Sequence, residues 1–404
     1  MAHLLGSRLE LGGRLDSRPC FIGSGLVVRR NSRRTVCHVG IGFTASDFEI
    51  LRQVGQQGYY EVTEWEYYER RDPTEPRRTI ETSKPAIRLY DGKILAGPLR
   101  NTRVMLKEFL EPAYEIGIRE AEVYKGLLDI ENQRNIPVSE LLGSFCGDNT
   151  FQKPEFELAW RRSFPRAGDP PRKGSPWLVF TWEGNLTTSG FASFAQPVNF
   201  TDRFFPAQKV ERRRRYLRKV MALALEAVAF LHSRGFIHRS LGPASLSVNT
   251  LDENLVNVLD LKIRDFGFGS SVSLLEDKEV KKARESGASS PAEVSRYFFA
   301  DDIYALGYAF MEIIFGSLSE SGPGPQTTQE ALKRLFEDVY ERNVANLREY
   351  ISADENYSEA VQFLDQDSFA GWNLISAMLS SLKDIDRQSA PMASELLESS
   401  FMKL

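Results

Sequence analysis

The order of strand and helix patterns along the chain most constrains its fold. Alternating, β-branched or aromatic residues predict strands through the first half, at 48–51, 60–65, 87–90, 103–109, 141–145 and 177–182. Helical spacing appears at 113–128 and most strongly at 207–233, just before Gly235, and helices dominate after Asp301. Two short strands are expected on either side of 249–256. Strands followed by helices predict an α+β fold with a small sheet lobe and a larger helical lobe.

Three segments lie outside these patterns. Val54 to Gly58 contains two glycines and predicts a turn between the first two strands. Residues 70–86 are charged and contain three prolines, which predicts a loop or an insertion. Residues 151–176 are rich in proline, arginine and lysine, and we interpret them as a surface loop. The sequence contains no internal repeat.

The charge of the chain excludes some function classes. The 404 residues carry a net charge of −4, so no basic surplus exists to neutralise the phosphates of a nucleic acid. No apolar run approaches the roughly 18 to 20 residues that a membrane span needs, and the best candidate, 304–316, contains Glu312. We therefore expect no nucleic-acid partner and no transmembrane segment.

The first 40 residues differ from the rest. They hold seven arginines, no lysine and two acids, a balance of +5 against −9 for the remainder. Together with their serines and glycines, this composition is typical of an organellar transit peptide, and 35–37 resembles plastid processing sites. The alternative is an unstructured basic tail on a cytosolic protein. Two of the three cysteines lie here, which leaves Cys146 and excludes a disulfide framework or a zinc site.

Three further segments carry candidate chemistry. The first is the apolar strand Val104–Phe109 with Lys107 near its end. The second is the strand 261–264, which runs directly into Asp265-Phe266-Gly267. The third begins 25 residues upstream of it, where Phe236-Ile237-His238-Arg239-Ser240-Leu241-Gly242-Pro243-Ala244-Ser245-Leu246-Ser247-Val248 follows the long helix.

In this order and spacing the segments resemble the eukaryotic-type protein-kinase family over roughly residues 47–404. The resemblance implies a two-lobed kinase-like fold with an N-lobe at about 47–180, insertions near 66–95 and 151–176, and a C-lobe at about 185–404. Lys107 matches the lysine that holds nucleotide phosphates, with Glu120 or alternatively Glu122 as its helical partner. Asp265 matches the aspartate that binds Mg²⁺.

The resemblance assigns the remaining site positions residue by residue. It places the nucleotide loop at Gly55 to Val62, with Gly92 to Gly97 as the alternative. Phe180 matches the gatekeeper, and 181–183, including Trp182, match the hinge that meets the adenine ring. The amino-acid sequence of the hinge is similar to that of thylakoid state-transition kinases. The other family positions are His238 and Arg239 in the catalytic loop, Asp302 as the anchor of that loop, and Glu293 paired with Arg387.

The departures from the family pattern bear on activity. The family's catalytic base falls on Ser240, whose hydroxyl has no useful basicity at neutral pH, and loss of a positioned base costs on the order of 10²–10⁴ in rate. The catalytic-loop lysine falls on Gly242, and the asparagine that ligates a second Mg²⁺ falls on Ser245. In the nucleotide loop, two family glycines are Gln57 and Tyr60.

We therefore predict a plastid pseudokinase that retains a pocket for ATP, with Mg²⁺ at Asp265 and Ser245, and that acts through protein partners. It is expected to be soluble or peripherally associated with the thylakoid. An active atypical Ser/Thr protein kinase is the alternative, and a scaffold with a collapsed, empty cleft is a third possibility.

Overall fold

The computed structural model describes residues 41–65, 79–128, 136–164, 170–193, 204–320, 324, 327–380, 387 and 390–403. Residues Val36 to Leu404 form one compact unit. The predicted transit segment, 1–40, lies outside the described residues.

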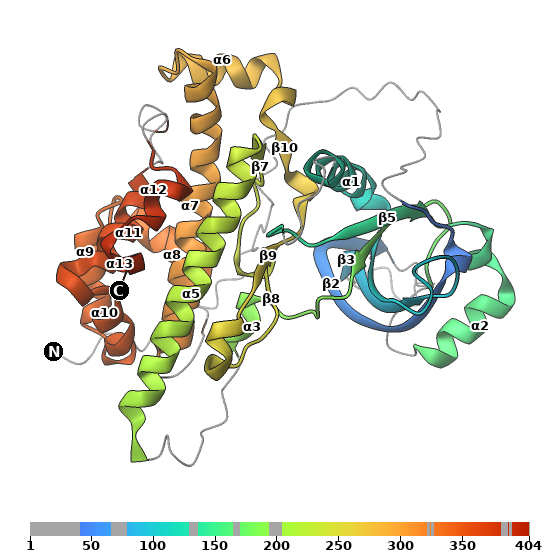
Figure 1. Ribbon diagram of the computed structural model, residues 1–404. Coiled ribbons are helices and arrows are strands. Elements are labelled where there is room, and N and C mark those ends of the chain that lie inside the picture. The colour runs from blue at the N-terminus through green and yellow to red at the C-terminus, as the bar shows by residue number, and fades with distance from the viewer. Residues whose placement is uncertain are drawn as a thin grey trace, which may run out of the picture. The chain divides into compact units, whose positions relative to one another are not determined.

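The first half of the described chain forms a six-stranded sheet in the order β1-β5-β6-β4-β3-β2 (Figure 1). All neighbouring strands are antiparallel except β1 and β5, which are parallel. The strands are β1 (Ile41–Gly42), β2 (Phe48–Trp65), β3 (Thr79–Ile94), β4 (Arg103–Phe109), β5 (Leu141–Cys146) and β6 (Pro176–Thr181).

The first hairpin differs from the sequence prediction. β2 runs without a break from Phe48 to Trp65, so the expected turn at Val54–Gly58 is wrong. It pairs with β3 along its whole length, and register shifts between Ile50 and Arg52 and between Gln53 and Gly55 accommodate the irregular stretch. The loop expected at 70–86 is wrong in its second part, because β3 begins at Thr79. Residues 66–78 lie outside the described residues.

Both faces of the sheet are covered. Helix α1 (Tyr114–Leu128) packs on one face, and its approach to β4 depends on Gly117, where a Cβ atom would lie 2.6 Å from the ring of Phe109. On the other face lies α2 (Pro154–Ser163), whose Trp160 is 2% exposed and meets the ring of Tyr90 at a centroid distance of 5.7 Å. The prediction that 151–176 is a loop is therefore wrong for the residues that form α2. Residues 165–169 lie outside the described part.

Helices make up most of the second half. The longest, α5 and α7, contact each other and carry the main apolar core, which continues up to α1 and β6. Gly235, with a φ of +71°, follows α5 and allows the chain to turn, as predicted. The helices are α3 (Thr188–Ser193), α5 (Pro206–Ser233), α6 (Asp277–Glu285), α7 (Pro291–Leu318), α8 (Gln329–Arg334), α9 (Val344–Ser352), α10 (Ser358–Leu364), α11 (Gln366–Leu379), α12 (Ala393–Leu397) and α13 (Ser400–Lys403).

Two small two-stranded antiparallel sheets follow α5. β8 pairs with β9, and β7 pairs with β10. These strands are β7 (Phe236–Ile237), β8 (Leu246–Val248), β9 (Leu261–Ile263) and β10 (Ser270–Ser271). The catalytic-loop segment connects β7 to β8, and the Asp-Phe-Gly segment connects β9 to β10. Both segments therefore run from one strand pair to the other, so the fold places them next to each other.

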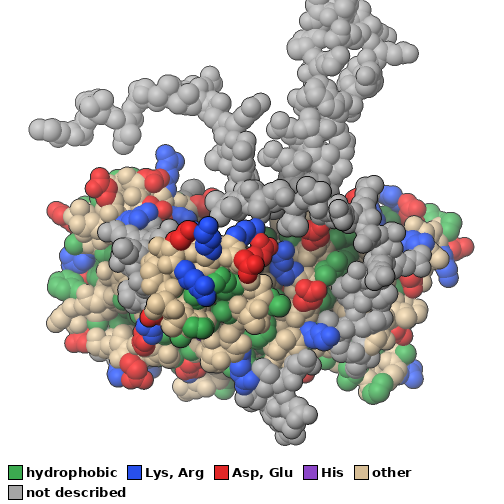
Figure 2. Space-filling model, turned by 90° about the horizontal axis from the view of Figure 1, so that it is seen from above, with side chains coloured by type: hydrophobic (Ala, Val, Ile, Leu, Met, Phe, Trp, Pro, Cys, Tyr) green, Lys and Arg blue, Asp and Glu red, His purple; other side chains and the backbone are tan. Residues whose placement is uncertain are grey.

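The described surface shows no strong charge bias on the face drawn in Figure 2, where basic and acidic side chains are interspersed. Helix α6 illustrates this mixture, because Asp277, Lys278, Glu279 and Lys281 follow one another along it. Within the described ranges, no helix has both the length and the apolar character that crossing a bilayer requires.

Candidate functional site

Lys107, Glu120 and Asp265 form a charged cluster where β4, α1 and the Asp-Phe-Gly segment meet. The Lys107 ammonium donates to both Glu120 carboxylate oxygens, at 2.9 and 2.8 Å, and to Oδ1 of Asp265 at 2.6 Å. Lys107 and Glu120 are almost fully buried, whereas the Asp265 side chain is 26% exposed. The structure thus selects Glu120, rather than Glu122, as the helical partner of Lys107.

The cluster holds its members in defined charge states. Burial lowers the pKa of Lys107, but Asp265 and Glu120 outweigh it and the pKa lies above its usual value. Burial likewise works against the ionised Asp265, yet Lys107 and then Arg264 bring the pKa of Asp265 below its usual value. For Glu120, burial is the largest effect and raises the pKa. At neutral pH the site therefore contains a firmly ionised Lys107–Asp265 pair.

The backbone of Asp265 and the packing of Phe266 fix this segment. Asp265 adopts the left-handed region, with φ 69° and ψ 53°. Phe266 is fully buried and lies edge-on to Tyr124, with 5.0 Å between ring centroids. A side chain at Gly267 would overlap Ile116 of α1, so only glycine fits there. The segment thereby joins α1 to the catalytic loop.

The catalytic loop is anchored by one buried carboxylate. Asp302, on α7, accepts hydrogen bonds from the backbone N–H groups of His238 (2.8 Å) and Arg239 (2.7 Å), as predicted. The His238 ring bonds to the Arg264 carbonyl through Nε2 at 2.9 Å and accepts the Ser240 N–H at Nδ1. Burial lowers the pKa of His238, which favours the neutral ring that this pairing requires.

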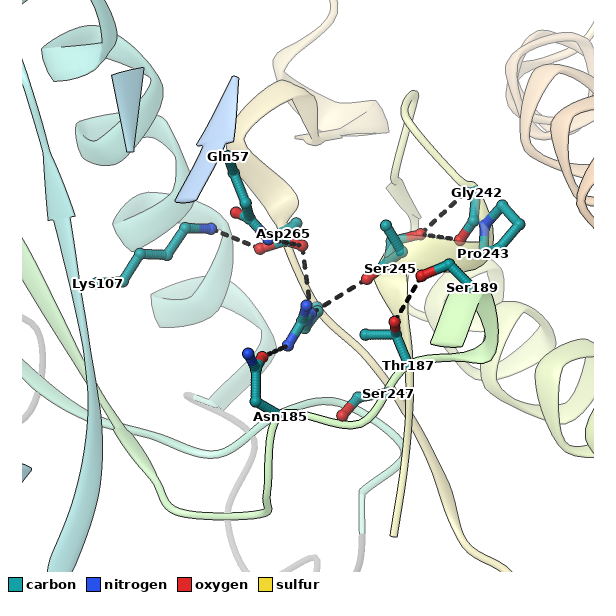
Figure 3. Close-up of polar contacts among 12 residues, drawn as sticks. Gln57, Lys107, Asn185, Thr187, Ser189, Gly242, Pro243, Ser245, Ser247 and Asp265 are labelled. Carbon is teal, nitrogen blue, oxygen red and sulfur yellow. Dashed lines mark hydrogen bonds and ion pairs between the residues drawn. The ribbon is translucent and has the colours of Figure 1, made fainter. Parts of the chain in front are cut away.

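Ser240, Gly242 and Ser245, the three catalytic-loop positions that differ from the family pattern, have side chains that offer little chemistry. Ser240 is exposed and takes part through its backbone in the bond to His238. The Ser245 hydroxyl accepts the Gly242 N–H at 2.9 Å and donates to the Gly242 carbonyl at 2.8 Å, so it serves as a local cap (Figure 3). Gly242 faces Gln329 of α8, whose Oε1 would lie 3.1 Å from an added Cβ.

Arg264 and Gln57 also belong to the cluster, although the sequence did not predict their contacts. The Arg264 guanidinium is 7% exposed and lies 3.4 Å from Oδ2 of Asp265. Gln57, on β2, donates from Nε2 to the same oxygen at 3.2 Å (Figure 3). The available signal for Arg264 was its position: a charged residue at the end of a buried strand, directly before the aspartate.

The predicted hinge follows β6. Phe180 is 2% exposed and packs edge-on against Tyr124 at 5.2 Å. The N–H groups of Thr181 and Trp182 already bond to the carbonyls of Glu140 and Arg103. Glu183 makes an ion pair with Lys262, and no backbone hydrogen bond is found for it within the described chain. Of the three expected hinge residues, Glu183 therefore has its backbone groups open.

Comparison with known proteins identifies the fold. The protein kinase domain model matches residues 197–402, just over half of the chain. The chain belongs to the protein kinase family. Among solved structures, an Stt7 homologue from Micromonas algae, soaked with ATP, has 15% identity and a TM-score of 0.54, covering 93% of this chain and 98% of that one. At this identity the likeness concerns the fold. A comparison with curated proteins gave no match.

Seen as a kinase domain, the described chain has the predicted two-lobed α+β architecture, with a β-rich N-lobe and a larger helical C-lobe. Its nucleotide loop differs from our prediction. Gly55 and Val62 lie within the continuous strand β2, where Val62 pairs with Thr82. The side chain of Val62 lies outside the described residues, as does the turn of the hairpin.

A second family position also differs from prediction. Glu293 does not pair with Arg387: its carboxylate accepts the N–H groups of Ser289 and Ser290 at 2.6 and 3.0 Å, which caps α7. Arg387 instead forms an ion pair with Asp301 at 2.7 Å. Helix α7 begins at Pro291, so Glu293 lies in its first turn. A Ser-x-x-Glu capping box is favourable at that position, and it occupies the Glu293 carboxylate.

The kinase fold implies Mg²⁺ near Asp265, but the donor set does not fit that ion. Mg²⁺ requires oxygen ligands in near-octahedral geometry. Oδ1 of Asp265 is bonded to Lys107, Oδ2 faces Gln57 and Arg264, and the Ser245 hydroxyl is bonded to Gly242. The predicted metal role of Ser245 therefore has no support in this arrangement.

Proposed function

We propose that this protein-kinase domain is a pseudokinase that binds ATP and acts through a protein partner. One observation carries the proposal: the catalytic loop presents Ser240, Gly242 and Ser245 in place of a base, a cation and a metal ligand, and the Ser245 hydroxyl is fully engaged by Gly242. A hydroxyl without a neighbouring base does not accept the proton of a substrate alcohol at neutral pH. Phosphotransfer therefore lacks its acid–base step.

Nucleotide binding is supported by a different set of groups. Lys107 is held in place by Glu120, and Arg264 supplies a second cation beside Asp265. Nη2 of Arg264 has no hydrogen-bond partner in the described chain, so one donor beside Asp265 remains available. At the hinge, the backbone of Glu183 remains open to a base. Lys107 and Arg264 would hold phosphates, and Glu183 and Phe180 would border the adenine.

The mechanism that we propose for such a pseudokinase is conformational. Asp265 already connects the two lobes, because it bonds to Lys107 and Gln57 of the sheet and lies beside Arg264, which follows β9. A nucleotide held by the same side chains would add to this connection and would change the surface shown to a partner protein.

An active atypical Ser/Thr kinase remains the second candidate, and one observation favours it. The Lys107–Glu120 pair is formed and Phe266 is packed under α1, as phosphotransfer in this family requires. A loose transition state needs little help from a base. The two candidates differ in whether bound ATP loses its γ-phosphate.

We further propose a plastid location and a domain that extends from about 47 to 404 behind a transit segment. The location is supported by the arginine-rich, acid-poor composition of 1–40. It is also supported by the similarity of the hinge sequence to that of thylakoid state-transition kinases.

Melting curves of the full chain with and without ATP test the binding part of the proposal. ATP at about 100 times its dissociation constant should stabilise the protein by roughly 2.7 kcal/mol. We expect Lys107→Met to lose this shift, because it removes a phosphate-binding cation. Lys125→Met, at an exposed position of α1, should keep it. Absence of a shift in the wild-type protein would contradict ATP binding and favour a scaffold.

A further inference from the structure

Arg264 is fixed beside Asp265 from three sides. It follows β9 directly, and its guanidinium donates from Nε to the Ala244 carbonyl at 3.2 Å and from Nη1 to Oδ1 of Asn185 at 3.0 Å. Nε also lies 3.4 Å from Oδ2 of Asp265. A guanidinium that is 7% exposed and held by two neutral acceptors and a carboxylate has little rotational freedom left to lose when it binds an anion.

The position of this cation coincides with the place where the kinase fold implies a metal. Oδ2 of Asp265, the carboxylate oxygen that Lys107 leaves free, is approached by Arg264 and Gln57. A divalent cation would have to displace both, and the Ser245 hydroxyl, the other predicted ligand, is engaged by Gly242. Arg264 is always protonated, and its planar fork suits phosphate oxygens.

We propose that the site around Asp265 binds a nucleoside triphosphate without a divalent cation, and that Arg264 supplies the positive charge that a metal ion would otherwise provide. This inference rests on the proposed ATP binding and specifies its chemistry. Lys107 and Arg264 place one cation at each carboxylate oxygen of Asp265, and the unpartnered Nη2 of Arg264 is the donor that a phosphate oxygen would take. Asp265 then positions the two cations and repels the nucleotide.

Calorimetric titration of the full chain with ATP, once in EDTA and once in Mg²⁺, tests the proposal. The wild-type protein should bind ATP with dissociation constants that agree within about threefold in the two buffers. Arg264→Met should weaken binding in EDTA by on the order of tenfold or more, the value of a charged hydrogen bond. Arg348→Met removes an arginine of α9 that pairs with Asp365, and it should leave binding unchanged.

Asp265→Asn provides a second variant that does not depend on the folding of Arg264→Met. If Asp265 repels the nucleotide, the neutral amide should bind ATP at least as tightly as the wild-type carboxylate, both in EDTA and in Mg²⁺. In Mg²⁺, a site built on a metal would instead lose its ligand and its affinity. The two readings predict opposite signs for the same substitution.

The outcomes separate this inference from the proposed function. Binding of ATP that requires Mg²⁺ would overturn the inference and leave the pseudokinase proposal standing. Unchanged binding by Arg264→Met in EDTA, or lost binding by Asp265→Asn, would also overturn it. No binding in either buffer would overturn both.

Discussion

Asp302→Ala should destabilise the domain by about 3 to 5 kcal/mol, because it leaves buried donors without an acceptor. Asp302 is fully buried, and its two carboxylate oxygens accept from the backbone of His238 and Arg239 and contact Nε2 of His232 at 3.1 Å. An alanine side chain satisfies none of them. Thermal unfolding should show a melting temperature lower by at least about 5 °C.

The neighbouring residue provides the matched control for this prediction. Asp301 is 42% exposed and pairs with Arg387, so Asp301→Ala should cost no more than about 1 kcal/mol. Equal losses in the two variants would mean that the catalytic loop does not depend on the Asp302 anchor.

Lys107→Met should have an effect of similar size, about 3 to 5 kcal/mol at neutral pH or above, since it leaves the buried Glu120 without its cation. The loss should depend on pH. Burial already raises the pKa of Glu120 above its unfolded value, and removal of the ammonium raises it further. A carboxyl with a raised pKa contributes stability below its unfolded pKa, and this contribution disappears as the pH rises through the folded value.

Unfolding measured at pH 5.5 and pH 8 checks this sign. Lys107→Met should lose more stability than the wild-type protein between these two pH values, and adding Glu120→Gln should recover part of the loss at pH 8. Lys125→Met should behave like the wild-type protein at both pH values. A Lys107→Met variant that is as stable as the wild type at pH 8 would show that the ion pair does not stabilise the fold.

Much of the fold could be predicted because its elements have strong local patterns. The helical spacing before Gly235 predicted α5, and the short strand pattern just before Asp265 predicted β9. Lys107 and Asp302 were assigned their partners from spacing within family motifs, and the structure brings both to the expected partner. Asp265 was expected to bind Mg²⁺, and its carboxylate instead accepts a hydrogen bond from Lys107.

The failures have physical reasons. A bulged strand accommodates glycines, so Gly55 and Gly58 appeared to mark a turn that β2 does not make. Pro154 at the start of α2 and Glu155 in its first turn are helix signals that the proline and arginine content of the segment concealed. Glu293 was assigned a distant partner although the Ser290 capping box, a local signal, determines its position.

The contacts of Gln57 and Arg264 could not be predicted from the sequence. Gln57 lies 208 positions from Asp265, and only the path of the extended hairpin brings them together. Arg264 is adjacent to Asp265, but adjacent residues of a strand point to opposite faces unless the backbone changes direction. The left-handed conformation of Asp265 makes that change, and it depends on packing that the sequence does not show.

Single-turnover phosphotransfer tests the central claim most directly. The full chain in excess over γ-labelled ATP would be incubated in Mg²⁺, beside Ser240→Asp and Lys107→Met, with ATP binding measured on the same samples. We predict that the wild-type protein binds ATP and moves no label to protein or water above background. Ser240→Asp should also stay at background, because Gly242 and Ser245 remain. Transfer by the wild-type protein that disappears in Lys107→Met would contradict the pseudokinase account.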